Sequence, residues 1–131
     1  MKFKIDTKEK FRVITLQETD LSANMTATLH QLLSESPVGQ PPHVVLKMGA
    51  VTNISAEAAN CILEIQQQYY DRGHSMVICE MGEAVEKVLE ELELLDLLNA
   101  TPTESEAWDI VQMEEIEREL LGEDDSDQPT T

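Results

Sequence analysis

The side chains that could support catalysis or metal binding are few and scattered along the sequence. His30, His43 and His74 have no cysteine or carboxylate at the spacing of a metal site, so we interpret them as surface or strand-end residues. Cys61 falls in a helical pattern and Cys79 in an apolar strand, where a thiol acts as a small buried hydrophobic group. The sequence alone still leaves a Cys–His nucleophile pair open.

Motifs for phosphate binding and for acid–base catalysis are absent from the sequence. The five glycines stand alone, and none belongs to a glycine-rich loop. Glu57, Glu64 and the other acidic helix residues form no evident acid–base pair. A receiver domain would need an aspartate at the end of the middle strand, where this chain has Met48-Gly49-Ala50-Val51. We therefore expect a binding module rather than an enzyme, with no cofactor and no metal.

The charge of the chain is strongly asymmetric. Of its 131 residues, 1–79 carry 8 acidic and 7 basic groups, whereas 80–131 carry 18 acidic and 2 basic groups. The acidic half is either a set of solvated helix faces or a surface that attracts a basic protein partner. A polyanion repels phosphate backbones, so nucleic acid is not an expected partner.

Composition and hydropathy indicate one cytoplasmic domain. No apolar run is long enough to span a membrane, and the first residues lack the apolar stretch of a signal peptide. The 2 cysteines argue against a disulfide framework and favour reduced thiols. We expect the domain to cover residues 1–120 and residues 121–131 to be an acidic, disordered tail.

Hydrophobic periodicity predicts alternating strands and helices. Phe3 and Ile5 alternate with polar residues, which is typical of a half-buried strand, and a second strand follows in a hairpin. Asp20 or Ser22 is predicted to cap a following helix with its apolar positions at Leu21, Met25, Leu29, Leu32 and Leu33. The remaining strands are predicted over 43–48, 76–79 and 98–101, and the remaining helices over 55–71, 82–95 and 103–120. Right-handed crossovers between these strands imply a mainly parallel sheet.

The last predicted helix has a clear start and an apolar pattern. Thr103 is a capping residue, with Glu106 three residues later completing a capping box. The apolar positions that we expect to pack on the sheet are Ala107, Ile110, Val111, Met113, Ile116 and Leu120.

Two stretches resemble a known family. The first is the apolar segment 44–54, in which a buried strand is followed by Val51-Thr52-Asn53-Ile54 and then a helix. The second is the segment 73–107, with Leu95-Asp96-Leu97-Leu98 before a short strand and Thr103-Glu104-Ser105-Glu106-Ala107 opening the last helix. Both are similar to the STAS domain family, the fold of bacterial anti-sigma factor antagonists, and the element order agrees over most of residues 2–118. The resemblance implies a single α/β domain with a four- to five-stranded mixed sheet and about four helices.

The resemblance also locates a functional centre at the start of the helix after the middle strand. Antagonists usually carry Asp-Ser-Ser-Gly there, and the partner anti-sigma factor, itself a kinase, phosphorylates the second serine and thereby breaks the complex. These positions align with Ser55, Ala56, Glu57 and Ala58, so the usual phosphorylated serine is missing. A glycine of the family before Leu-Asp is also replaced, by Leu94. The partner-binding residues implied by this alignment are Thr52, Asn53, Ser55, Ala56, Glu57 and Asn60.

Ser55 and Glu57 each have two interpretations. Ser55 is a helix cap or, alternatively, a displaced phosphorylation site. Glu57 is either an acidic residue that is favourable at a helix N-terminus, or a permanent, partial substitute for phosphoserine with about one charge instead of nearly two.

The function implied by the resemblance is non-enzymatic regulation through protein–protein contact. The expected partner is an anti-sigma factor or serine kinase. One alternative is a STAS-type scaffold subunit of a stress-signalling or transport assembly. Another is a small-ligand or nucleotide sensor that binds an anion at the same helix N-terminus. Glu57 disfavours the sensor, because its carboxylate would stand where the anion binds.

Overall fold

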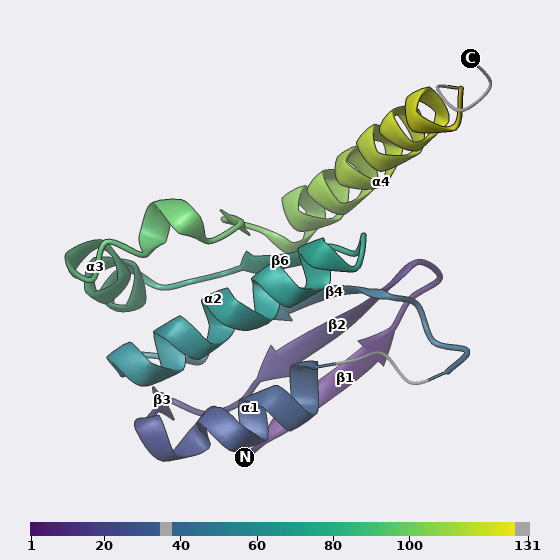
Figure 1. Cartoon of the computed structure of the whole chain (residues 1–131). Coiled ribbons are helices and arrows are strands. Elements are labelled where there is room, and N and C mark those ends of the chain that lie inside the picture. The colour runs from purple at the N-terminus through teal and green to yellow at the C-terminus, as the bar shows by residue number, and fades with distance from the viewer. Residues whose placement is uncertain (35–37, 128–131) are drawn as a thin grey trace.

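A five-stranded mixed sheet forms the centre of the molecule (Figure 1). The computed structural model describes residues 1–34 and 38–127, with side chains up to residue 121. The strand order is β1-β2-β4-β6-β7, in which the β1–β2 pair is antiparallel and the other pairs are parallel. The strands are β1 (Phe3–Thr7), β2 (Phe11–Leu16), β4 (His43–Lys47), β6 (Met76–Cys79) and β7 (Ala100–Thr101). The predicted hairpin and central strands are therefore confirmed.

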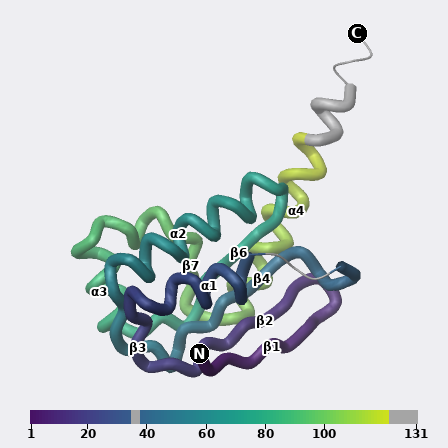
Figure 2. The backbone as a smooth tube through the Cα atoms, turned by 60° about the horizontal axis from the view of Figure 1, so that its bottom comes forward, coloured from purple at the N-terminus to yellow at the C-terminus, as the bar shows by residue number. Residues whose placement is uncertain are grey.

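Helices cover both faces of this sheet. The α-helices of the described residues are α1 (Thr26–Leu33), α2 (Ala56–Asp71), α3 (Glu83–Glu91) and α4 (Glu104–Asp127), with 3₁₀ turns η1 (Ala23–Met25) and η2 (Leu95–Leu97). The first three α-helices pack on one face and α4 packs on the other (Figures 1 and 2). Side chains of β4 alternate between the two layers: Val44 and Leu46 lie in the larger core, and Val45 lies under α4.

A second, two-stranded sheet was not predicted. In it, β3 (Asp20–Leu21) pairs in parallel with β5 (Asn53–Ile54). The prediction that Leu21 belongs to the helix is therefore wrong. Of the two predicted caps, Ser22 does precede the first helical turn, η1, although its side chain makes no capping hydrogen bond. Leu21 is fully buried, and its carbonyl accepts a hydrogen bond from the Ser55 backbone N–H at 2.9 Å. Pairing with β5 thus keeps this segment extended, and helical structure begins only at Ala23.

The first strand is less buried than its sequence pattern indicates. Phe3 and Ile5 are each 42% exposed, and the other three residues of β1 are exposed as well. The reason is the position of β1 at the edge of the sheet, where β2 is its one neighbouring strand among the described residues.

The last helix is only partly covered by the sheet. Ala107 and Val111 are buried as predicted, whereas the predicted core positions Met113, Ile116 and Leu120 are more than half exposed. The helix also runs to Asp127, so residues 121–127, expected to begin the tail, are helical. The rest of the predicted tail, 128–131, lies outside the described residues.

Polar contacts anchor α4 at the amino ends of β4 and β6. The His43 Nδ1 accepts the Ser75 backbone N–H at 3.0 Å, so Nε2 carries the ring proton and donates it to Glu115 Oε2 at 3.0 Å. The Arg118 guanidinium donates to the His74 carbonyl at 2.7 Å and to the Ser75 hydroxyl at 2.8 Å. These bonds fix the direction in which α4 leaves the domain.

Candidate partner-binding site

The predicted site lies where the chain passes from β4 into α2. The segment is held by the backbone carbonyls of Thr19 and Leu21. The Thr19 carbonyl accepts the backbone N–H groups of Thr52 and Asn53, at 2.8 and 3.1 Å, and the Thr52 hydroxyl at 3.1 Å. Val51 and Ile54 are buried on either side of the exposed pair Thr52 and Asn53. The turn is thus rigidly attached while its polar side chains remain at the surface.

Ser55 is the N-cap of α2. Its backbone is extended (φ −80°, ψ 160°), and its hydroxyl oxygen accepts the Ala58 backbone N–H at 3.0 Å. The predicted capping role is confirmed, since the side chain satisfies one of the free N–H groups of the first turn. This contact also holds the hydroxyl against the helix start, with the side chain only partly exposed.

Glu57 is exposed in the first turn of α2. A negative charge there is favourable next to the free N–H groups of the helix start. Ala58, which aligns with the glycine of the family, is fully buried against the core. Glu57 is therefore exposed at the surface, while the side chain of Ala58 packs in the core.

The predicted site residue Asn60 is exposed one turn further along α2. Its amide donates to the Ala56 carbonyl at 2.9 Å, which holds the side chain along the helix. Of the six predicted site residues, Thr52, Asn53, Glu57 and Asn60 are exposed, and Ser55 and Ala56 are partly buried. The structure thus places all six in the turn before α2 and in the first two turns of that helix.

The first turn of α3 lies beside this surface, because α3 packs against β5. Val85 and Leu89 anchor α3 in the core, and the acidic residues Glu83 and Glu86 of its first turn are exposed. With Glu57, they make this end of the molecule acidic.

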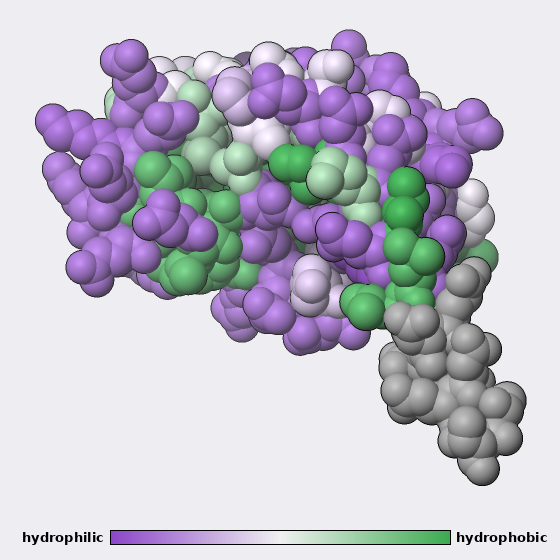
Figure 3. All heavy atoms as spheres, turned by 90° about the horizontal axis from the view of Figure 1, so that it is seen from above, coloured by the Kyte–Doolittle hydropathy of each residue, from purple (hydrophilic) through white to green (hydrophobic). Residues whose placement is uncertain are grey.

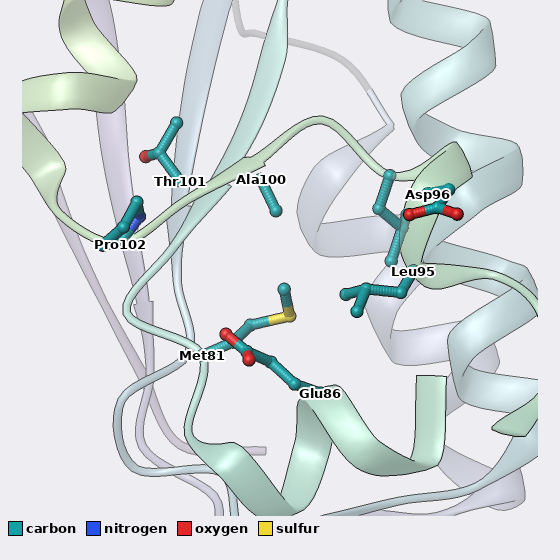
Figure 4. Close-up of a pocket in the computed structure, with 8 residues that line it drawn as sticks. Met81, Glu86, Leu95, Asp96, Ala100, Thr101 and Pro102 are labelled. Carbon is teal, nitrogen blue, oxygen red and sulfur yellow. The ribbon is translucent and has the colours of Figure 1, made fainter. Parts of the chain in front are cut away.

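A hollow of about 370 Å³ between α3, η2 and β7 was not predicted (Figure 4). Met81 and Glu86 lie on one side of it, and Leu95 and Asp96 lie on another. It is lined by residues between 81 and 102 that come from several elements, so no local sequence pattern marks it.

Leu94 stands where the family carries a glycine before Leu-Asp, and its backbone conformation does not require a glycine. Leu94 has φ −105°, an ordinary value, and the neighbouring Glu93 has φ 60°. The left-handed residue of this turn is therefore Glu93, at a cost of about 1–2 kcal/mol for a side chain with a Cβ.

The cysteines are unsuited to nucleophilic catalysis. Burial raises the pKa of the Cys79 thiol to about 12, and burial also raises the pKa of Cys61. A thiol with a raised pKa has little reactive thiolate at neutral pH. Within residues 1–34 and 38–127, no cluster of three or more histidine, cysteine or acidic side chains could hold a metal ion. No helix of this part of the chain is long and apolar enough to cross a bilayer.

Structural comparison finds the same fold in proteins of different roles. The anti-sigma factor antagonist SpoIIAA in its unphosphorylated form is 16% identical, with TM-score 0.64, covering 85% of this chain and 96% of its own. A variant of RsbS from Moorella thermoacetica is 18% identical, with TM-score 0.64, and the match covers 86% of this chain and 96% of the RsbS chain. A sulfate transporter family protein from Wolinella succinogenes is 13% identical, with TM-score 0.67, and the match covers 83% of this chain and 90% of the other.

A sequence comparison with curated proteins finds no match. The family model for the STAS domain, in contrast, matches residues 2–107, which include the whole sheet and the predicted site. The fold, the match and the predicted element order agree: this chain belongs to the STAS domain family.

Proposed function

We propose that this chain is a non-enzymatic regulatory module that binds a protein partner through the start of α2, as an antagonist of anti-sigma factors. We further propose that phosphorylation at the usual position does not switch it. The observation that carries the proposal is Glu57, an exposed carboxylate at the position where the family carries the phosphorylated serine. A carboxylate accepts no phosphoryl group from a serine kinase.

The rigidity of the turn supports a binding role. Its backbone is tied to the carbonyls of Thr19 and Leu21, and the Thr52 hydroxyl also donates to the Thr19 carbonyl. A preorganised surface loses little conformational entropy on binding, which favours affinity. The same rigidity would let a single change of charge at residue 57 decide whether a partner fits.

The charge of Glu57 defines the expected strength of the complex. Phosphoserine carries nearly two negative charges, and Glu57 carries about one. If phosphorylation releases the partner in the family, Glu57 would weaken the complex without abolishing it. This chain would then be an antagonist of constant, intermediate affinity instead of a switched one.

The binding surface can be tested by introducing positive charge. The wild type, Asn60→Arg and Gln67→Arg would each be immobilised and exposed to lysate, and retained proteins would be identified by mass spectrometry. Both asparagine and glutamine are exposed amides of α2, about two turns apart, so Gln67→Arg is the matched control. We expect an anti-sigma factor or serine kinase to be retained by the wild type and by Gln67→Arg, and lost with Asn60→Arg. Equal retention by all three would contradict the assigned surface.

A scaffold role in a stress-signalling or transport assembly is the second candidate. It is favoured by the similarity of the fold to the sulfate transporter family protein. Retention of a transporter component or of another STAS protein, with no kinase, would support it.

A further inference from the structure

The outer side of α4 carries an apolar stripe that the domain itself does not use. We define the α4 stripe as Met113, Ile116 and Leu120, which are 59%, 55% and 57% exposed. Their spacing of three and four residues places them on one side of the helix. The side that packs on the sheet is the other one, formed by Ala107 and Val111.

The stripe is bordered by acidic side chains. Of the residues of α4, eleven are acidic and one, Arg118, is basic. Asp109 lies one turn before Met113, and Glu117 and Glu119 flank the stripe, all of them exposed. Figure 3 shows green atoms running along α4 with purple atoms beside them. An apolar line between acidic borders has the pattern of one partner in a helix–helix contact.

The stripe is also remote from the start of α2. The helix begins at the carboxyl end of β7, and Arg118 bonds to His74 and Ser75 at the amino end of β6. In Figure 1 the outer end of α4 projects from the domain on the side opposite to α3 and β3. The whole stripe also lies beyond residue 107, where the match to the family model ends.

We propose that the α4 stripe binds a basic amphipathic helix of a protein partner. Apolar side chains of that helix would cover Met113, Ile116 and Leu120, and its flanking lysines or arginines would face the acidic borders. A second copy of this helix is a poor occupant, since two segments with a net charge of −10 would face each other. This surface is additional to the one proposed at α2, so the chain would join two partners at opposite ends.

Binding of two fluorescently labelled synthetic peptides tests this proposal. The full chain would be titrated into each peptide in physiological salt, and binding would be measured by fluorescence anisotropy. One has a leucine on every third or fourth position and lysine elsewhere; the other has the same composition with the leucines dispersed around the helix. We expect the amphipathic peptide to bind about tenfold or more tightly than the dispersed one, because only it buries the stripe. Equal binding would show attraction between charges alone and would overturn the proposal.

Variants locate the contact. The double variant Ile116→Gln/Leu120→Gln keeps residues of good helix propensity. It should weaken binding of the amphipathic peptide about tenfold or more, because it removes the apolar side chains of the stripe. Leu97→Gln, at a similarly exposed leucine of η2, is the matched control and should bind as the wild type does. Emission of Trp108, stacked on Phe11 with ring centroids 4.6 Å apart, verifies that α4 remains docked.

Two results would overturn the assignment to a basic partner. The first is unchanged affinity in the Ile116→Gln/Leu120→Gln variant with Trp108 emission preserved. The second is a wild-type dimer in analytical ultracentrifugation that this variant abolishes, which would identify a second copy as the occupant. The peptide comparison needs the wild type alone, so it decides the question even if the variant fails to fold.

Discussion

The hydroxyl of Ser55 accepts the backbone N–H of Ala58 at 3.0 Å and thereby closes the first turn of α2. This bond makes the serine nearest to the family's phosphorylation position a structural residue. Removing it in Ser55→Ala should lower the free energy of unfolding by about 1 kcal/mol, measured by urea denaturation. Ser55→Asp, which retains a capping oxygen, should lose much less. Equal losses in both variants would show that the cap is not what Ser55 contributes.

The central strand offers a direct test of the fold. Val45 is fully buried between the sheet and α4, so Val45→Asp would place an unpaired charge in a dry interior. We expect a loss of several kcal/mol in the free energy of unfolding, measured by chemical denaturation. Val38→Asp, at a fully exposed valine, is the control and should remain within about 0.5 kcal/mol of the wild type. Wild-type stability of Val45→Asp would contradict the assignment of β4 as a central strand.

Acidification should destabilise the domain through the groups around the amino end of β4. The hydrogen bond from His43 lowers the pKa of Glu115 from its usual 4.5, and burial lowers the pKa of His74 from its usual 6.5. In both cases the unfolded chain binds the proton more readily than the folded one, so stability falls as the pH falls. The loss should begin below about pH 6.5 with His74 and continue below about pH 4.5 with Glu115.

Urea denaturation at a series of pH values would measure this dependence. His74→Asn should flatten the upper part of the profile, and Glu115→Gln should flatten the lower part. A profile that is unaffected by either substitution would show that other groups determine the response to acid.

The acidic half of the chain leads us to expect that association with the proposed partner depends on salt. If its surface attracts a basic partner, the association rate constant should fall markedly from low salt to 0.15 M ionic strength, where the Debye length is about 8 Å. Stopped-flow mixing with the partner retained by the wild type would measure it. A rate that does not change with salt would instead favour solvated helix faces without a role in association.

Much of the architecture could be predicted because long elements repeat their apolar residues many times. The segments that became α2 and α3 carry such a pattern, and those that became β4 and β6 carry short continuous apolar runs. Ser55 could be recognised as a cap from the residues that follow it. The strands β3 and β5 could not be predicted, since two residues have no periodicity. Their pairing depends on contacts between segments that are far apart in the sequence.

The prediction that Met113, Ile116 and Leu120 pack on the sheet is wrong for a different reason. Its apolar residues satisfy helical spacing on two sides, and the sequence does not say which side the sheet covers. Ala107 and Val111 lie over the sheet, whereas Met113, Ile116 and Leu120 face away from it. The order of the main strands and helices thus followed from local patterns and the expected site from the family resemblance, but the exposed side of α4 required the tertiary structure.

The most direct test of the central claim is phosphorylation at residue 57. Wild type, Glu57→Ser and the control Glu64→Ser, an exposed glutamate of the same helix, would be incubated with the retained kinase and ATP. Mass spectrometry would locate any phosphate, and binding would be measured with and without ATP. If Glu57 is a fixed partial substitute for phosphoserine, Glu57→Ser should bind more tightly than the wild type without ATP. With ATP it should be phosphorylated at residue 57 and released, while the wild type and Glu64→Ser remain bound and unmodified. A phosphate on Ser55 of the wild type, with release of the partner, would contradict the account.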